Sequence, residues 1–408
     1  MRAPRRPVLA VLVGLIALLF AAVGLPPEDD AAGGAPKAAM PAIALQGSTT
    51  DPPGHAEPEP EPDPEPRRTL SLVMGGDLLW HNTVWQSAAA DAARTGAGGG
   101  YDFDPMFAAL RPLVRGADLA LCHEEVPFAL PGRPLQSFPV FAAPPQIAPW
   151  LARMGFDACT TASNHAVDQG FEGLKHTADL LEANGVRHVG TFRTARERRR
   201  PVILTTDQGV RVGVVAGTYS LNGFPLPEGR PWSVSMWDEQ NLLGQAEQAR
   251  AAGADIVVVH LHGGDEYSHL PNADQVTLVD RLTASPAVDL VLGEHAHVVQ
   301  PITRVNGTWV VYGMGNMIAQ QELGRPRTYE GIAVRFRFRE GPDGRFRVTE
   351  AAYVPTYWNN YAAGPIRIQR VVRALADGTG NRARLLEARA EIRAAVNALG
   401  GNRGLQER

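Results

Sequence analysis

The chain has 408 residues, of which 44% are hydrophobic, so it can bury at least one large core and has room for two domains. Its formal charge of −4 gives no support for nucleic-acid binding, because proteins that bind nucleic acid present a basic surface. With only two cysteines, Cys122 and Cys159, a disulfide-dense scaffold and a cysteine-rich zinc site are both excluded. Both cysteines lie in apolar, strand-like sequence, where cysteine behaves as a small hydrophobe. We therefore expect two buried free thiols, with a disulfide as the alternative in an oxidising compartment.

Residues 1–27 have the pattern of an export signal or a membrane anchor. Arg2, Arg5 and Arg6 precede an apolar run over residues 8–25, which is close to the length that spans a bilayer. We favour an uncleaved anchor with its basic end in the cytoplasm. The expected location is therefore the cell membrane, as a single-pass protein with an extracytoplasmic domain, or outside the cell if the signal is cleaved.

Three further segments follow the anchor. Residues 28–68 include a run that alternates proline with acidic residues, which predicts an extended, charged linker. Residues 69–365 are expected to form the folded domain. Residues 366–408 are rich in Ala, Arg and Glu and predict a C-terminal segment of one or two amphipathic helices. The basic run 193–200 is more typical of a solvated surface than of a binding patch.

Short apolar runs alternate with amphipathic segments along the domain, and this alternation predicts an α/β fold. Strands are expected at 69–74, 117–122, 156–160, 186–189, 202–205, 210–216, 255–262, 288–292 and 310–316. Helices are expected at 103–113, 147–154, 171–184, 239–252 and 273–284. Residues 331–339 and 345–353 alternate in polarity around a Gly-Pro-Asp-Gly turn, which predicts an antiparallel hairpin.

Polar side chains follow the expected strands at the points where the strands end. They are Asp77, His123-Glu124-Glu125, Asn164-His165, His260 with His262, and His295 with His297. An isolated Gly-Asp or Asn-His pair is more often a turn. The recurrence of such residues at several strand ends instead favours a metal site, because ligands of α/β folds bind at the carboxyl ends of strands. The histidines of each i, i+2 pair also share a face, which suits metal ligation.

Together these motifs resemble the poly-γ-glutamate capsule synthesis (CapA) family, a branch of the calcineurin-like metallophosphoesterase superfamily. The resemblance runs from about Thr69 to Asn316. The motifs that carry it are Gly76-Asp77, His123-Glu124-Glu125-Val126-Pro127, Asn164-His165 with Asp168 and Gly170, His262-Gly263-Gly264-Asp265-Glu266-Tyr267, Gly293-Glu294-His295-Ala296-His297-Val298-Val299-Gln300 and Gly315-Asn316. It implies a metallophosphoesterase-like αββα sandwich with the active site at the strand carboxyl ends. It also implies divalent metal ions, two in number, of which Mn, Fe and Zn are not distinguished.

The same resemblance implies a role for each site residue. The implied metal ligands are Asp77, Glu125, Asn164, His262, His295 and His297. Asp77 and His297 would hold one ion. The second ion would be held by Asn164, His262 and His295, and Glu125 would bridge the two ions. The implied catalytic residues are His165, which contacts the reacting group, and Asp168.

The chain departs from the expected motifs at four positions. Leu79 stands where the superfamily has a metal-binding histidine, so His81 or His123 would have to substitute. His123 replaces the usual Asn before the acidic step. Gly263 and Ala296 replace the usual Trp and Pro of the histidine motifs.

Two functions are compatible with these motifs. The first is a metal-dependent hydrolase outside the cytoplasm that acts on an anionic surface polymer such as poly-γ-glutamate, or on a phosphoester. The second is a non-catalytic accessory factor that binds the polymer during capsule assembly or export. The expected partners are the anionic polymer, the cytoplasmic membrane and the proteins of a capsule synthesis complex, with no nucleic acid. Leu79 favours the second function, whereas the intact Asn164-His165 pair favours the first.

Overall fold

The computed structural model describes residues 67–322 and 324–408. The expected anchor, residues 1–27, and all of the expected linker except its last two residues lie outside the described part of the chain. Residues Pro64–Arg408 form one compact unit. Among the described residues, no helix is both long enough and apolar enough to cross a membrane.

The strands are β1 (Thr69–Leu78), β2 (Leu119–Glu124), β3 (Ala158–Thr160), β4 (Arg187–Val189), β5 (Val202–Thr205), β6 (Arg211–Thr218), β7 (Ile256–His262), β8 (Leu290–Glu294), β9 (Ile302–Val305), β10 (Thr308–Val311), β11 (Asn316–Ile318), β12 (Glu330–Glu340), β13 (Phe346–Trp358), β14 (Ile368–Arg370) and β15 (Leu405–Glu407). The α-helices are α1 (Asn82–Thr95), α2 (Asp104–Phe107), α3 (Arg111–Arg115), α4 (Ile147–Met154), α5 (Gly170–Ala183), α6 (Ala195–Arg198), α7 (Glu239–Ala251), α8 (Ala273–Ala284), α9 (Val371–Asp377) and α10 (Arg382–Asn397). Two 3₁₀ turns, η1 (Pro326–Tyr329) and η2 (Tyr361–Ala363), complete the described elements.

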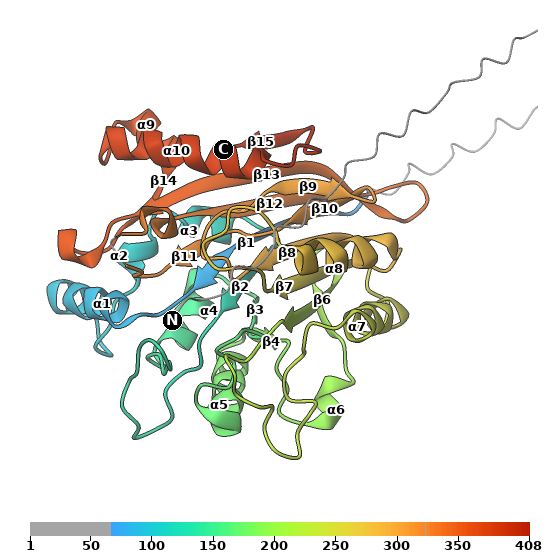
Figure 1. The fold of residues 1–408 in the computed structure, drawn as a ribbon, viewed down its shortest axis with the longest axis horizontal. Coiled ribbons are helices and arrows are strands. Elements are labelled where there is room, and N and C mark those ends of the chain that lie inside the picture. The colour runs from blue at the N-terminus through green and yellow to red at the C-terminus, as the bar shows by residue number, and fades with distance from the viewer. Residues whose placement is uncertain (1–66, 323) are drawn as a thin grey trace, which may run out of the picture. The chain divides into compact units, whose positions relative to one another are not determined.

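The strands form two sheets that lie face to face (Figure 1). The first sheet has the order β14-β13-β12-β1-β2-β3-β4, with β11 paired to β1 and β15 paired to β13. The second has the order β5-β6-β7-β8-β10-β9. β1 to β4 run parallel to one another, as do β6, β7 and β8, so their carboxyl ends come to the same edge of each sheet.

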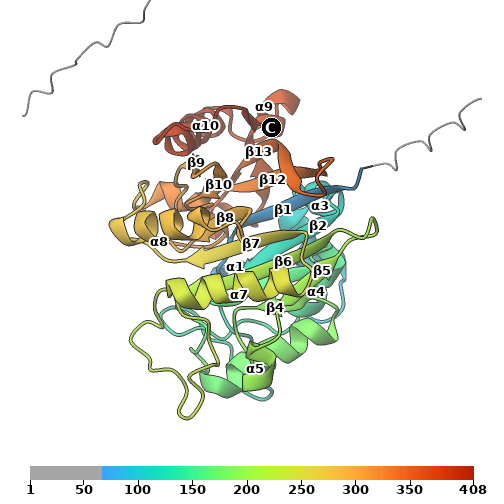
Figure 2. The same ribbon diagram turned by 90° about the vertical axis from the view of Figure 1, so that its right-hand side faces the viewer.

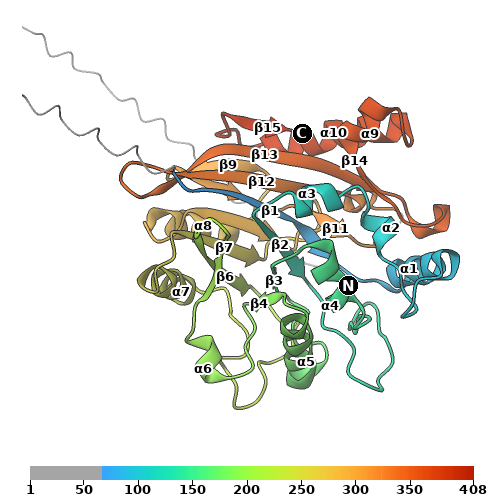
Figure 3. The ribbon, with the colours of Figure 1, turned by 180° about the vertical axis from the view of Figure 1, so that it is seen from behind.

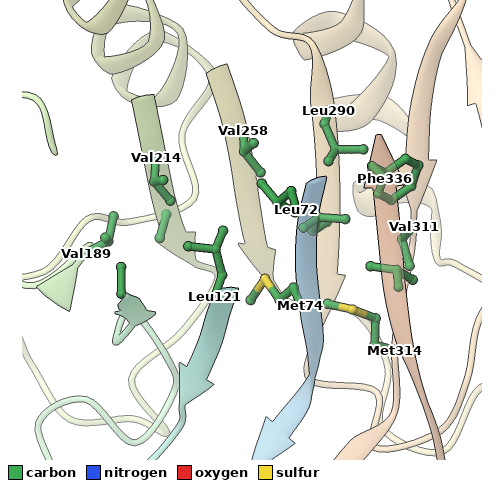
Figure 4. Close-up of a cluster of buried hydrophobic side chains, with 14 of the residues drawn as sticks. Leu72, Met74, Leu121, Val189, Val214, Val258, Leu290, Val311, Met314 and Phe336 are labelled. Atoms are coloured by element: carbon green, nitrogen blue, oxygen red, sulfur yellow. The ribbon is translucent and has the colours of Figure 1, made fainter. Parts of the chain in front are cut away.

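Alternation along the parallel strands divides their side chains between the interior of the sandwich and its outer faces. On β2, Leu119 and Leu121 pack between the sheets, and on β7 Ile256 and Val258 do the same. Figure 4 shows this layer, in which Leu72 and Leu121 of one sheet face Val258 and Leu290 of the other. Continued to the strand ends, the same alternation turns His123, His260, His262 and Glu294 toward the interior.

Helices cover both outer faces of the sandwich. α7 and α8 pack on the outer face of the second sheet through a separate apolar cluster (Figure 2). Helices α1 to α5 cover the outer face of the first sheet (Figure 3). The expected αββα sandwich is therefore confirmed.

The two side edges of the sandwich are closed differently. At the edge of β13 and β9, Ile392, Ala395 and Val396 of α10 extend the core between the sheets. At the other edge lie β4 and β5, the last strands of their sheets, and residues 190–201 with α6 connect them.

The expectation of two free thiols is wrong. Cys122 and Cys159 form a disulfide between the neighbouring strands β2 and β3. They lie directly opposite each other in the parallel register, with their Cα atoms 4.4 Å apart, which is within the range that a disulfide bridges. The sequence context showed that both positions are buried, but only the strand register shows that they are opposite.

The C-terminal segment contains more than helices. α9 and α10 lie where amphipathic helices are expected, but β14 pairs with β13 on one side and β15 pairs with it in parallel. The expected hairpin is present as β12 and β13. Helix α1 and strand β9 have no counterpart among the elements predicted from the sequence.

Candidate metal centre

The carboxyl ends of the parallel strands bring the polar motifs of both sheets together. Asp77, at the end of β1, is paired with His123 of β2 on one side and with Asn316 of β11 on the other. In the second sheet, His262 at the end of β7 lies opposite Glu294 of β8. All five side chains are buried. Because the strands end at this point, Asp77 and Asn316 become neighbours although they are 239 positions apart in the sequence.

Asp77 lies at the centre of this cluster. Its Oδ2 atom is 3.2 Å from Nδ1 of His297, and its Oδ1 atom is 3.8 Å from Nε2 of His123 and 3.9 Å from Nδ1 of His262. Two groups of three ligand atoms, each within 4.8 Å of one another, therefore share this carboxylate. One is Asp77 with His123 and His262, and the other is Asp77 with Glu125 and His297.

Glu125 joins the same cluster from the loop that follows β2. Its Oε1 atom is 3.9 Å from Nε2 of His262 and 3.8 Å from Nε2 of His297. The Oδ1 atom of Asn164 is 2.9 Å from Nε2 of His262. The ring of His295 lies 4.8 Å from that of His262 and 5.9 Å from that of His297. The structure thus brings all six implied metal ligands into one cluster, while their individual roles stay predictions.

Unpartnered polar atoms show that this cluster suits a cation. Both carboxylate oxygens of Asp77 and of Glu125 are buried without a hydrogen-bond partner, as is a ring nitrogen of each of His123, His262 and His295. Burying such groups without partners is costly. A divalent cation would satisfy them together, and carboxylate oxygen with imidazole nitrogen is a donor set that zinc, manganese and iron accept. The residues present therefore fit a metal ion.

Two effects shift the pKa values in the cluster: burial, and the charges of neighbouring side chains. Burial raises the pKa of Glu125 well above its ordinary range, and the charge of Asp77 raises it further. Burial opposes protonation of His297, but the charges of Glu125 and Asp77 outweigh it and raise its pKa to about 10. Burial holds the pKa of His262 well below its ordinary value. Protons retained beside two carboxylates mark a cluster short of positive charge, and a metal ion would displace them.

The structure also locates the two candidates to replace the ligand missing at Leu79. Leu79 is buried in the apolar cluster on the outer face of the first sheet, away from the interior. His123 points inward, and its Nδ1 atom is 2.8 Å from Oγ1 of Thr160, which leaves Nε2 directed toward Asp77. His81 instead accepts a hydrogen bond from the backbone N–H of Gln320 through Nδ1. Of the two, His123 is the one within reach of Asp77.

The predicted catalytic residues form a hydrogen-bonded pair beside the cluster. Nδ1 of His165 is 2.7 Å from Oδ2 of Asp168, and the backbone N–H of Phe141 donates to the same oxygen at 2.7 Å. The ring of Phe141 also packs edge-on against His165, with 4.8 Å between ring centroids. These contacts fix the orientation of the imidazole. Asn222, from the loop after β6, approaches it and accepts a hydrogen bond from Asn164 at 3.1 Å.

Three residues of the site were not assigned a role from the sequence. Glu266 is exposed and forms a third group of possible ligands with His295 and His297. Asn316 places Oδ1 2.9 Å from Nδ1 of His297. Tyr219 lies against His295, with 4.6 Å between ring centroids. Glu266 and Asn316 belong to the motifs of the resemblance, so that signal was available, whereas no motif of the resemblance contains Tyr219.

The loop that carries His295 and His297 also has an unusual backbone conformation. His295 and His297 have φ values of 101° and 56°, a region that side-chain-bearing residues rarely adopt. Strain of this kind is concentrated at functional sites. Nearby, the ring of Trp237 covers Gly263, where an added Cβ atom would lie only 1.5 Å from Cζ3 of that ring. An indole from another loop therefore fills the space next to Gly263, and no side chain fits at this position.

Residues 71–321 match the family of bacterial capsule synthesis proteins named PGA_cap. The chain belongs to this family. The matched residues include every metal-ligand candidate and both predicted catalytic residues. The resemblance recognised from the sequence motifs is thereby confirmed.

The names of curated relatives also refer to PGA or capsule biosynthesis. The PGA biosynthesis protein CapA of Bacillus subtilis is 31% identical over 200 residues, which are 49% of this chain and 51% of that protein. The capsule biosynthesis protein CapA of Bacillus anthracis is 28% identical over 189 residues, covering 46% and 45% of the two chains. This PGA_cap chain thus spans about half the length of the curated relatives it matches. Among solved structures, the calcineurin-like phosphoesterase YfkN of Bacillus subtilis aligns with a TM-score of 0.41 and 15% identity over 80% of this chain and 97% of that one.

Proposed function

We propose that this capsule synthesis protein is a metal-dependent hydrolase that acts on an anionic surface polymer such as poly-γ-glutamate, or on a phosphoester. The observation that carries the proposal is the convergence of His297 with the unpartnered carboxylates of Asp77 and Glu125, next to the His165–Asp168 pair. Bound there, two divalent ions would supply Lewis-acid polarisation of the scissile group and activation of water. Family membership supports the polymer as the substrate class.

His165 has the contacts expected of a group that acts on the substrate rather than on the metal. Asp168 fixes its Nδ1 atom at 2.7 Å, so Nε2 is the atom left to interact with a substrate oxygen. In that role Asp168 would accept from Nδ1–H, and the imidazolium form would donate a hydrogen bond from Nε2 where negative charge develops. Asn164 links the two halves of the site, because it contacts His262 and Asn222 at once.

Metal analysis and turnover assays on the same preparation test the proposal. We expect bound Mn, Fe or Zn in the purified protein, release of poly-γ-glutamate fragments or of an aryl alcohol from an aryl phosphate, and loss of turnover with a chelator. Restoration of activity by one added metal would identify the ion. A metal-loaded protein that cleaves neither substrate class would contradict the hydrolase.

A polymer-binding accessory factor is the second candidate, and Leu79 is the observation that favours it. Without a histidine at that position, the ion beside Asp77 has fewer ligands than the superfamily pattern provides. The accessory factor predicts metal-dependent polymer binding with no product, and it predicts that His165→Ala leaves this binding unchanged. The hydrolase predicts loss of product in the same variant.

We further propose that the domain lies outside the cytoplasm and is held at the cell membrane through the apolar run 8–25. Protease treatment of intact spheroplasts should then release a folded fragment that begins near residue 68, since the compact unit begins close by. Complete protection of the chain until the membrane is lysed would refute this location.

A further inference from the structure

We propose that an arginine-lined cavity at the β4–β5 edge of the sandwich is a second binding site for the anionic polymer, one that holds its carboxylates away from the metal centre. The identity of the polymer rests on the proposed function. The cavity itself has a volume of about 320 Å³. It is lined by Arg187, Arg193, Arg196 and Arg200, together with the buried His188 and Thr191.

Positive charge exceeds negative charge around this cavity. Residues 187–200 contain six arginines, and three carboxylates, those of Asp179, Glu182 and Glu197, pair with them. Only four of the six arginines line the cavity, so they exceed the three carboxylates by one positive charge, in a chain whose formal charge is −4. This excess of positive charge is confined to the cavity region and is opposite in sign to the net charge of the whole chain. The expectation of a merely solvated surface does not account for a cavity lined by these side chains.

The lining arginines divide into a fixed pair and a free pair. Arg187 contacts Glu182 at 3.0 Å, and Arg193 contacts Glu197 and, at 3.0 Å, Asp179. Arg196 and Arg200 are exposed and have no carboxylate partner within the described residues 67–322 and 324–408. The fixed pair shapes the wall, while the free pair can bind an incoming anion. A guanidinium group binds a carboxylate through two parallel hydrogen bonds, which suits a polymer with one carboxylate per unit.

The cavity lies on the same side of the sheets as the metal centre. Thr191 follows the carboxyl end of β4 and lines both the arginine cavity and a small cavity against Glu125. Its Oγ1 atom is 2.6 Å from that of Thr161, which lies three residues before Asn164. Thr191 and Thr161 therefore lie between the arginine-lined cavity and the loop that carries Asn164 and His165. A long polymer bound at the arginines would have neighbouring units free to reach the centre.

The test measures binding of fluorescently labelled poly-γ-glutamate to the full-length chain with a chelator present, so that metal-dependent contacts do not contribute. The variant Arg196→Gln/Arg200→Gln removes the two free guanidinium groups. We expect it to bind about tenfold more weakly and to lose part of the salt dependence. The matched control is Arg382→Gln/Arg403→Gln, which removes two exposed arginines of α10 and the C-terminal loop and should change binding less than about twofold.

Three results would overturn the proposal. They are equal losses in the two double variants, unchanged binding in the cavity variant, and no salt-dependent binding by the unaltered chain. Polyphosphate serves as a competitor, and stronger binding of polyphosphate than of poly-γ-glutamate would refute a carboxylate-bearing ligand. Since no turnover is measured, a failure of the hydrolase proposal leaves these results unaffected.

Discussion

Each histidine around Asp77 uses one ring nitrogen for a neighbouring side chain and turns the other toward the cluster. His123 contacts Thr160 through Nδ1, and His262 contacts Asn164 through Nε2. The remaining nitrogens of both rings have no partner. Side-chain contacts that orient a ligand before the ion arrives raise metal affinity, because less ordering is left for the binding step.

Two single substitutions distinguish a role in binding the metal from a role in turnover. His262→Ala removes a ligand that lies between Asp77 and Glu125, and we expect the purified variant to lose most of its bound metal. His165→Ala should keep the metal and lose turnover by about 100-fold or more, because the proposed hydrolase uses this imidazole on the substrate. Elemental analysis and steady-state assays check both. Full metal content in His262→Ala would contradict the ligand role.

Leu79→His tests whether the missing superfamily ligand could be restored at its own position. Leu79 is packed in the apolar cluster behind the first sheet, so an imidazole there would be buried without a partner. We expect no added metal and a loss of unfolding free energy on the order of 2 kcal/mol. Leu79→Met is the control and should cost less than about 1.5 kcal/mol. Tighter metal binding by Leu79→His would show that this site is not built around His123.

The sequence identified the site residues because they are few, polar and placed after apolar strands. Asp77, Glu125 and His262 could be grouped in this way because parallel strands end at a common edge. Glu266 could not be grouped on those grounds, since it lies in a loop whose path depends on contacts such as the backbone hydrogen bond from Tyr267 to Ala296. Tyr219 likewise reaches His295 only through the fold of its loop.

At the scale of elements, the disulfide between β2 and β3 closes a loop that contains α4. The two cysteines are 37 residues apart, and a crosslink over that length stabilises the folded state by about 4 kcal/mol through the entropy of the unfolded chain. Reduction of the native protein should therefore lower its unfolding free energy by several kcal/mol. Chemical denaturation with and without dithiothreitol checks this expectation.

The variant Cys122→Ala/Cys159→Ala supplies the control for that measurement. It should unfold at the lower stability with and without the reductant. Equal stability of the oxidised and reduced native protein would mean that the crosslink contributes nothing to the fold.

Elements with a clear hydrophobic pattern in their own sequence were predicted. Elements that form only by pairing with a strand far away in the sequence were not. Residues 256–259 are apolar on both faces of β7, which is typical of a parallel strand covered on both sides. β15 is three residues long, and it pairs with β13 only because α10 returns the chain to that edge. No local pattern carries that information.

At the scale of the whole molecule, buried histidines tie stability to pH. Burial lowers the pKa of His81 to about 4, from an ordinary value of 6.5. Between these values the unfolded chain takes up a proton at this residue and the folded chain does not. The contribution of His81 to the unfolding free energy should therefore fall as the pH is lowered from about 6.5 to about 4, by about 1.4 kcal/mol per pH unit. The carboxyl groups of Glu124 and Glu294, whose pKa values burial raises, contribute a slope of opposite sign.

Denaturation of the metal-free protein across this pH range measures the slope. Burial lowers the pKa values of His123 and His260 to about 3, so they add a slope of the same sign. Relative to the unaltered protein, His81→Gln should lose less stability as the pH falls toward 4, whereas His176→Gln, at a partly exposed position on α5, is the matched control. A steeper dependence in His81→Gln would show that this histidine is charged in the folded protein.

The chain enters the domain at Arg68, which is fixed by ion pairs to Asp255 before β7 and to Glu340 at the end of β12. β1 begins at the next residue, and Asp77, near its far end, is about 30 Å from Arg68 at the rise of an extended chain. A force applied to the chain at Arg68 would thus act at the end of β1 opposite Asp77, and the ion pairs of Arg68 with Asp255 and Glu340 would take up that force before it reached the metal-ligand candidates.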